Sequence, residues 1–223
     1  MGTTPSNVAL MRVLDTELYR PASPIVAIDA RHCSPRATTL LFKKSALSDG
    51  FQIRDITDKH ALRFRTTSRS WLSRAPARRR TQLVDASRRL VASFRPELAP
   101  PNKLLYSVCR GSAGDLGEPE LFQIHARSKH TTTELRVEFV DAASGEPCSV
   151  GMYGSWLHRT AIVWLRQGAS GEPKPVAKLY PPAHNQPRRD EFCLSVSANV
   201  DASLLALVCL TLHDQESRSV EGR

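Results

Sequence analysis

The sequence predicts a mainly β fold, in which about twelve strands close into a barrel around a hydrophobic helix near the C-terminus. Two observations carry this prediction. From residue 38 to residue 197 the chain consists of short segments that alternate apolar and polar residues between turn residues, as half-buried strands do. Residues 202–212, in contrast, are apolar almost without interruption.

The expected strands follow one another at hairpin spacing, with no helical period between them, so β-α-β units are not expected. The segment 133–141 has the clearest alternation, with Leu135, Val137 and Phe139 on one face. The expected strands are residues 38–44, 51–56, 61–66, 81–86, 89–95, 103–110, 121–127, 133–141, 147–154, 158–166, 175–180 and 191–197.

The last apolar run is predicted to be a helix that begins after Asp201, whose carboxylate can cap the first backbone N–H groups. The run has eleven residues, which span about 16 Å as a helix, whereas a membrane span needs about 20 apolar residues. A helix that is apolar on every side is therefore expected inside the protein. His213 is placed near the C-terminal end of this helix. The expected core residues are Leu204, Leu205, Leu207, Val208 and Leu210.

Basic residues are concentrated in one region. The chain has a net charge of +9, and the segment from Arg63 to Arg95 holds ten arginines with Asp85 as its one acid. Such a region can attract anionic lipid, nucleic acid or an acidic protein, and a solvated arginine-rich loop is the alternative interpretation. The candidate anionic-ligand residues are Arg74, Arg78, Arg79, Arg80, Arg88 and Arg89.

Other residues could support such a surface. If the barrel forms, the arginines at 74–80 and at 88–89 are expected to meet on one edge, where Trp71 and Leu72 could insert into a membrane interface. Secondary candidates are Lys43, Lys44, Lys174 and Lys178.

The domain organisation expected from composition is a flexible leader at 1–36, one barrel domain at 37–216 and a short tail at 217–223. The leader has four prolines and no sustained periodicity, although residues 23–29 could form a short edge strand. The N-terminus has no secretory signal, and the five cysteines have no metal-ligand spacing. A cytoplasmic location is expected, peripheral at the plasma membrane or nuclear as alternatives. The start "MGTTPS" also fits the myristoylation pattern, which short sequences often match by chance.

Signals of enzymatic chemistry are absent from the sequence. No nucleophile elbow, zinc-protease, EF-hand or phosphate-loop pattern occurs, so no catalytic residue, metal or cofactor is expected. Cys109, Cys193 and Cys209 are expected to be packed in the core. Arg159, after the Gly154-Ser155 turn, is expected to hold its loop by bonds to carbonyls, with Trp156 packed at a barrel end.

Four stretches carry a family resemblance: "DGFQIRD", "LVDASRRLVASFR", "YGSWLHRTAIVW" and "DEFCLSVSANVDASLLALVCLTLHDQ". Over about residues 37–216 the chain resembles the LURP-one-related family, which belongs with the tubby C-terminal-like and phospholipid-scramblase-like barrels. Before the helix the family commonly has Pro-Gly-Val-Asp, and this chain has Ala198-Asn199-Val200-Asp201. Asn tolerates a left-handed turn nearly as well as Gly, so the turn can be kept.

The resemblance implies a twelve-stranded barrel around a central helix, but it implies no reaction, because the family has no agreed activity. Tubby relatives bind phosphoinositides through surface basic residues. The resulting hypothesis is a non-enzymatic module that docks on anionic membrane surfaces or on a protein partner in signalling or stress response. The alternatives are a nucleic-acid or chromatin-associated regulator, which lacks aromatic interleaving and is less favoured, and scramblase-like lipid handling.

Overall fold

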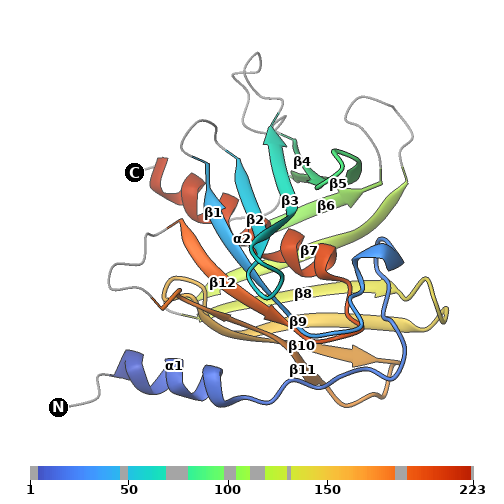
Figure 1. The fold of residues 1–223 in the computed structure, drawn as a ribbon, viewed down its shortest axis with the longest axis horizontal. Helices are drawn as coiled ribbons and strands as arrows, with labels where there is room; N and C mark the ends of the chain where they lie inside the picture. Colours follow the sequence, from blue (N-terminus) through green and yellow to red (C-terminus); the bar gives the residue numbers. More distant parts are fainter. Residues whose placement is uncertain are drawn as a thin grey trace.

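A closed barrel forms the body of the molecule in a computed structural model that describes residues 5–45, 50–68, 80–97, 104–110, 119–129, 132–183 and 190–221. Within these residues twelve antiparallel strands each pair with their neighbours in sequence, and β1 pairs with β12 to close the ring (Figure 1). The expected strands and their order are thereby confirmed. The strands are β1 (Thr38–Lys44), β2 (Phe51–Asp55), β3 (Ala61–Ser68), β4 (Thr81–Asp85), β5 (Leu90–Pro96), β6 (Leu104–Cys109), β7 (Glu120–Lys129), β8 (Thr132–Val140), β9 (Pro147–Ser155), β10 (Thr160–Gln167), β11 (Lys174–Tyr180) and β12 (Glu191–Val196).

Alternation decides which side chains face the interior, because successive strand residues point to opposite faces of a sheet. In β8 the three residues Leu135, Val137 and Phe139 are all buried. In β2 Ile53 is buried while Arg54 is exposed on the outer face. The interior is thus mostly apolar, and the outer surface carries most of the charges.

The helix α2 (Ala202–Glu221) runs through the ring of strands (Figure 1). The side chains of Leu204, Leu205, Leu207, Val208 and Leu210 are between 0% and 4% exposed. Each buried leucine or valine contributes roughly 1.5–3 kcal/mol relative to an exposed one, so this helix supplies much of the core.

The start of α2 has the geometry that the sequence indicates. Asp201 Oδ1 accepts a hydrogen bond of 3.0 Å from the Ser203 backbone N–H, which confirms the expected cap. Asn199 has a φ of 64°, so the left-handed turn is kept without glycine. The helix continues past the apolar run to Glu221, because no glycine or proline occurs between His213 and Glu221. The expectation that His213 lies near the helix C-terminus is therefore wrong.

One end of the barrel is covered by residues 25–33, which we call the strap. The start of α2 and the β2–β3, β4–β5 and β8–β9 turns lie at this end, which we call the sealed end, and α2 leaves the barrel at the other, the exit end. Residues Ile25 to Ile28 are at most 8% exposed. The Asp201 Oδ2 atom accepts hydrogen bonds from the Ile28 N–H (2.8 Å) and the Asp29 N–H (3.2 Å). The Asp141 Oδ1 atom accepts one from the Val26 N–H (2.8 Å).

The N-terminal region differs from the loose leader that the sequence predicts. Residues 5–15 form a helix, α1 (Pro5–Asp15), which packs on β10 and β11 (Figure 1). Its C-terminal end is held by Lys178, whose Nζ donates to the carbonyls of Leu14 (2.6 Å) and Thr16 (2.9 Å). Pro5 occupies the first position of the helix, where the missing N–H costs nothing.

The strap is also not the expected edge strand, since Ile25 and Cys33 form only isolated bridges, to Val200 and Asp201. It contains a short 3-10 helix, η1 (Ala30–His32). Its order comes from contacts with residues more than 100 positions away, which local periodicity does not reveal. In the described part of the chain, no helix is both long enough and apolar enough to cross a bilayer.

Candidate anionic-ligand surface

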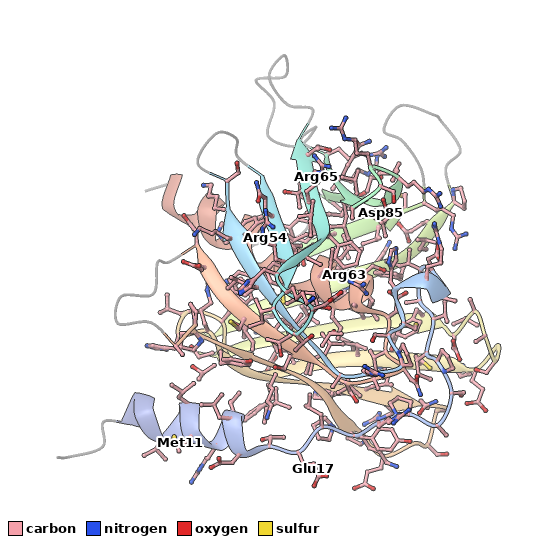
Figure 2. All side chains as sticks on the ribbon, viewed as in Figure 1. Met11, Glu17, Arg54, Arg63, Arg65 and Asp85 are labelled. Atoms are coloured by element: carbon pink, nitrogen blue, oxygen red, sulfur yellow. The ribbon has the colours of Figure 1, made fainter. Side chains whose placement is uncertain are left out.

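Three arginines project from the outer face of β2 and β3. Arg54 lies on β2, and Arg65 on β3 pairs in register with Gln52 of β2. Ile53 pairs with Phe64, but the next residue, Arg54, pairs with Leu62. Arg63 is therefore an extra residue in a β-bulge of β3. Figure 2 shows Arg54, Arg63 and Arg65 on the same side of the barrel, with Asp85 of β4 beside them.

These arginines form no ion pair with a carboxylate of the described residues, although Asp85 lies beside them. Arg54 donates to the His60 carbonyl and to Gln52 Oε1, both at 3.2 Å. The Arg65 Nε atom is buried and makes no hydrogen bond. Within the described residues none of Arg54, Arg63 and Arg65 forms an ion pair, and the nearby Asp55 is 2% exposed because it faces the interior.

The β4–β5 turn presents two of the arginines that the sequence singles out. Arg88 is at a φ of 64°, and its N–H donates to the Asp85 carbonyl at 3.0 Å. The Arg89 N–H donates to Asp85 Oδ1 at 2.9 Å, so Asp85 fixes the backbone of the turn. The side chains of Arg88 and Arg89 are exposed at the sealed end.

Arg80 lies at the opposite end of the same strand. It directly precedes β4, whereas Arg88 and Arg89 follow it, and five strand residues separate the two positions by about 17 Å. The expectation that both groups meet on one edge is therefore wrong for Arg80. In a series of antiparallel hairpins, successive turns lie at alternate ends of the barrel. Arg80 is therefore at one end, and Arg88 and Arg89 are at the other. Outside the described residues lie Arg74, Arg78, Arg79, Trp71 and Leu72.

We call the described basic residues of this side the arginine surface. They project from the outer face of β2 and β3 and from both ends of β4. They are Arg54, Arg63, Arg65, Arg80, Arg88 and Arg89.

Two further arginines border this surface at the sealed end and were missed by sequence reasoning. Arg110 follows β6 and donates from Nη2 to the Ile28 carbonyl at 2.8 Å. Arg31, in the strap, forms an ion pair of 2.6 Å with Asp29, and this bond lowers the pKa of Asp29 to about 2. Because alternate turns of antiparallel strands lie at the same end, the strand order could have placed Arg110, after β6, at the barrel end of the β4–β5 turn. No sequence signal locates the strap.

The lysines that the sequence offers as secondary candidates have other contacts. Lys43 Nζ lies 3.9 Å from a carboxylate oxygen of Glu191. Lys174 Nζ lies 4.2 Å from the centre of the Tyr19 ring, and Lys178 caps α1. Lys174 and Lys178 thus hold the N-terminal region against the barrel.

One buried arginine, Arg159, lies at the exit end. Arg159 is 6% exposed and donates from Nη1 to the Trp156 carbonyl at 2.8 Å, which confirms its expected loop-holding bond. Its guanidinium lies 4.1 Å from the centre of the Trp156 ring. Trp156 itself packs edge-on against Phe192 at 5.3 Å. These contacts stabilise the loop between β9 and β10.

The cysteines are unsuited to nucleophilic chemistry. All five are free, and Cys109, Cys148, Cys193 and Cys209 are buried. Burial raises the pKa of Cys209 to about 12, so its thiolate is scarce at neutral pH. Across the described ranges, no group of three His, Cys, Asp or Glu side chains could hold a metal ion.

The sequence profile of the LURP-one-related family matches residues 38–213. The chain belongs to the LURP-one-related family. An X-ray structure of a protein from Arabidopsis thaliana is similar to it, with a TM-score of 0.57 and 21% sequence identity over 86% of this chain and 99% of that chain. At this identity the likeness shows the fold. No curated protein matches the sequence.

The match divides the molecule into two parts. The LURP-one-related segment comprises the twelve strands and α2 as far as His213, and it contains the arginine surface. The helix α1 and the strap precede the matched residues. The sealed end of this LURP-one-related barrel is thus closed by a segment from outside the family match.

Proposed function

We propose that this LURP-one-related barrel is a non-enzymatic binding module that docks on phosphoinositide-containing membrane surfaces through the arginine surface. The observation that carries the proposal is the grouping of Arg54, Arg63 and Arg65 on one outer face, where none of them forms an ion pair within the described residues. The core is filled by α2, so a ligand has to bind outside the barrel.

The chemistry of the arginine surface suits phosphate groups. A guanidinium presents a planar fork of donors that matches phosphate oxygens. Clusters of four to eight basic residues are typical of surfaces that bind anionic lipid headgroups.

Vesicle sedimentation tests the proposal. The full chain should pellet with phosphatidylcholine vesicles that contain phosphatidylinositol 4,5-bisphosphate and should stay in solution with pure phosphatidylcholine. Each basic residue near an anionic membrane contributes about 1 kcal/mol, so replacing Arg54, Arg63 and Arg65 together by Gln should weaken binding by about 100-fold. The matched control is Arg127→Gln, which removes an exposed charge from β7 on another side of the barrel.

Two results would contradict the proposal. One is equal pelleting with neutral and phosphoinositide vesicles. The other is a triple variant that pellets as well as the Arg127→Gln control. If the triple variant loses salt-sensitive binding to a duplex oligonucleotide while neither protein pellets, the surface serves nucleic acid instead.

A further inference from the structure

A groove crosses the outer face of β7 to β10, away from the arginine surface of β2 to β4. Its volume is about 530 Å³, and a neighbouring hollow of about 620 Å³ adjoins it. Both hollows are lined by the same three polar residues, Arg136, Ser149 and Arg166. Volumes of this order fall within the range of small-ligand sites, and both hollows are open to solvent.

An aromatic ring forms part of the groove. Trp164 of β10 is paired in register with Gly151 of β9. A Cβ atom at residue 151 would lie 2.0 Å from Cζ2 of Trp164, so the indole rests directly on the β9 backbone. Only glycine permits this placement. Trp164 is half-buried, with one face against the strand, and it lines the groove.

Two arginines and a hydroxyl stand next to this ring. Arg166 pairs in register with Ser149, and its guanidinium carbon lies 5.8 Å from the Trp164 ring centre. The Nε atom of Arg166 is buried and has no hydrogen-bond partner. In the described part of the chain Arg166 forms no ion pair, although the carboxylates of Glu134 and Glu138 line the same hollows.

Arg136 approaches the same point from β8, where it pairs in register with Gly151. Its Nη2 atom lies 2.5 Å from Glu138 Oε1, and both side chains are 66% exposed. Exposed ion pairs contribute little, so a ligand anion can compete for Arg136. Glu138 is therefore a competitor for the site.

We propose that this groove binds a small planar aromatic anion. Its ring stacks on Trp164, and its acid group is held by Arg136, Ser149 and Arg166. Trp164 favours a ligand with an aromatic ring, because aromatic faces stack on one another. The guanidinium groups of Arg136 and Arg166 favour a ligand with an acid group. The inference does not depend on membrane docking, because the two surfaces lie on different strands.

Calorimetric titration of the full chain tests the ligand class. The probes are 1-naphthyl phosphate and 1-naphthoate, which have both features and differ in their acid group. Cyclohexyl phosphate lacks the aromatic face and 1-naphthol lacks the charge. One aromatic stack contributes about 0.5–1.5 kcal/mol, which is about two- to tenfold in affinity. At least one of the two aromatic anions should therefore bind more tightly than cyclohexyl phosphate and 1-naphthol by a factor of this size. Equal affinity for all four compounds, or no binding of either aromatic anion, would overturn the proposal.

Variants test the residues. Arg166→Gln should weaken binding about tenfold or more, because hydrogen bonds to charged groups contribute about 1.5–3 kcal/mol. Glu138→Gln should strengthen binding, because it releases Arg136. Gly151→Ala should weaken it by displacing the indole, and Trp164→Leu replaces this test if the alanine variant does not fold. Arg36→Gln, which removes an exposed charge that lines neither hollow, is the matched control and should change nothing.

The sign of the Glu138 effect is the sharpest criterion. A binding role for Arg136 predicts a gain of affinity, whereas a merely structural ion pair predicts none. Unchanged binding in Arg166→Gln or in Glu138→Gln would overturn the assignment. Vesicle sedimentation of the same variants should be normal, so failure here leaves the proposed membrane function standing.

Discussion

The two ends of the barrel are closed by different kinds of interaction. At the sealed end, the buried carboxylates of Asp201 and Asp141 accept hydrogen bonds from the main chain of the strap. At the exit end, side chains contact one another around α2. His213 Nε2 lies 2.9 Å from Asp190 Oδ1, and the His213 ring packs edge-on against Phe51 at 4.6 Å.

The difference lies in burial as well as in chemistry. Asp201 is 0% exposed, whereas the Asp190 side chain is 43% exposed. A buried carboxylate that holds backbone N–H groups fixes the chain rigidly, and its loss leaves several donors unsatisfied. The Asp190 carboxylate is partly open to water, although its partner His213 is only 8% exposed, so this contact is screened more than the Asp201 contacts are. The sealed end is therefore the stronger closure, and the exit end is easier to alter.

The largest expected effect removes the helix that connects the two ends. Leu207→Asp places an unpaired charge at a position that is 0% exposed, so the barrel should unfold outright. Circular dichroism and thermal melting measure this. The matched control is Leu157→Asp, at a leucine that is 58% exposed, which should leave the melting temperature nearly unchanged. A folded and soluble Leu207→Asp protein would contradict the role of α2 as the core.

The fold was predictable from the sequence because its signals are local. Short extended segments between turn residues, some with clear alternation, located the strands, and the length of the apolar run separated a core helix from a membrane span. The strap was not predictable in the same way. Its residues Ile25 to Ile28 are buried through bonds to Asp141 and Asp201, which lie far away in the sequence and carry no pattern that points to them.

The second prediction compares the two ends by making the same Asp-to-Asn substitution at each of them. Asp201→Asn keeps the size of the side chain but replaces one acceptor by a donor that faces the N–H groups of Ile28 and Asp29. We expect a loss of about 3 kcal/mol in the free energy of unfolding. Asp190→Asn should cost less, about 1 kcal/mol, because that carboxylate is 43% exposed.

Urea denaturation measures both free energies, and hydrogen exchange locates the change. The amides of Ile28 and Asp29 should exchange faster in Asp201→Asn and at the wild-type rate in Asp190→Asn. Equal losses in the two variants would remove the distinction between a rigid and an adaptable end.

The candidate surface was only partly predictable. The charge excess between Arg63 and Arg95 was evident, but the sequence does not show which arginines share a face. Arg63 lies in a β-bulge that a register shift creates. Arg54 lies on the same face as Arg65 because β2 pairs with β3. The groove was invisible for a related reason. It requires Trp164 to lie on Gly151 of the adjacent strand, and this is a property of register.

The smallest expected effect is a pH dependence at the sealed end. His32, in the strap, is buried with its Nε2 atom unpartnered, and its ring packs edge-on against Phe64 at 5.0 Å. Burial lowers the pKa of His32, because the imidazolium would lose its hydration, and the nearby Asp201 and Asp29 carboxylates oppose this shift only in part. The unfolded chain therefore takes up a proton at a higher pH than the folded chain.

The sign follows from this difference in proton binding. Stability is fully present above the ordinary histidine pKa of 6.5 and falls as the pH drops below it, because protonation then favours the unfolded chain. His32→Phe keeps an aromatic ring against Phe64 and removes the titration, so its free energy of unfolding should fall less than that of the wild type between pH 7 and pH 5. Urea denaturation at both pH values measures the difference. If the variant loses as much stability on acidification as the wild type, the pH dependence arises elsewhere, and the sealed end does not sense pH through His32.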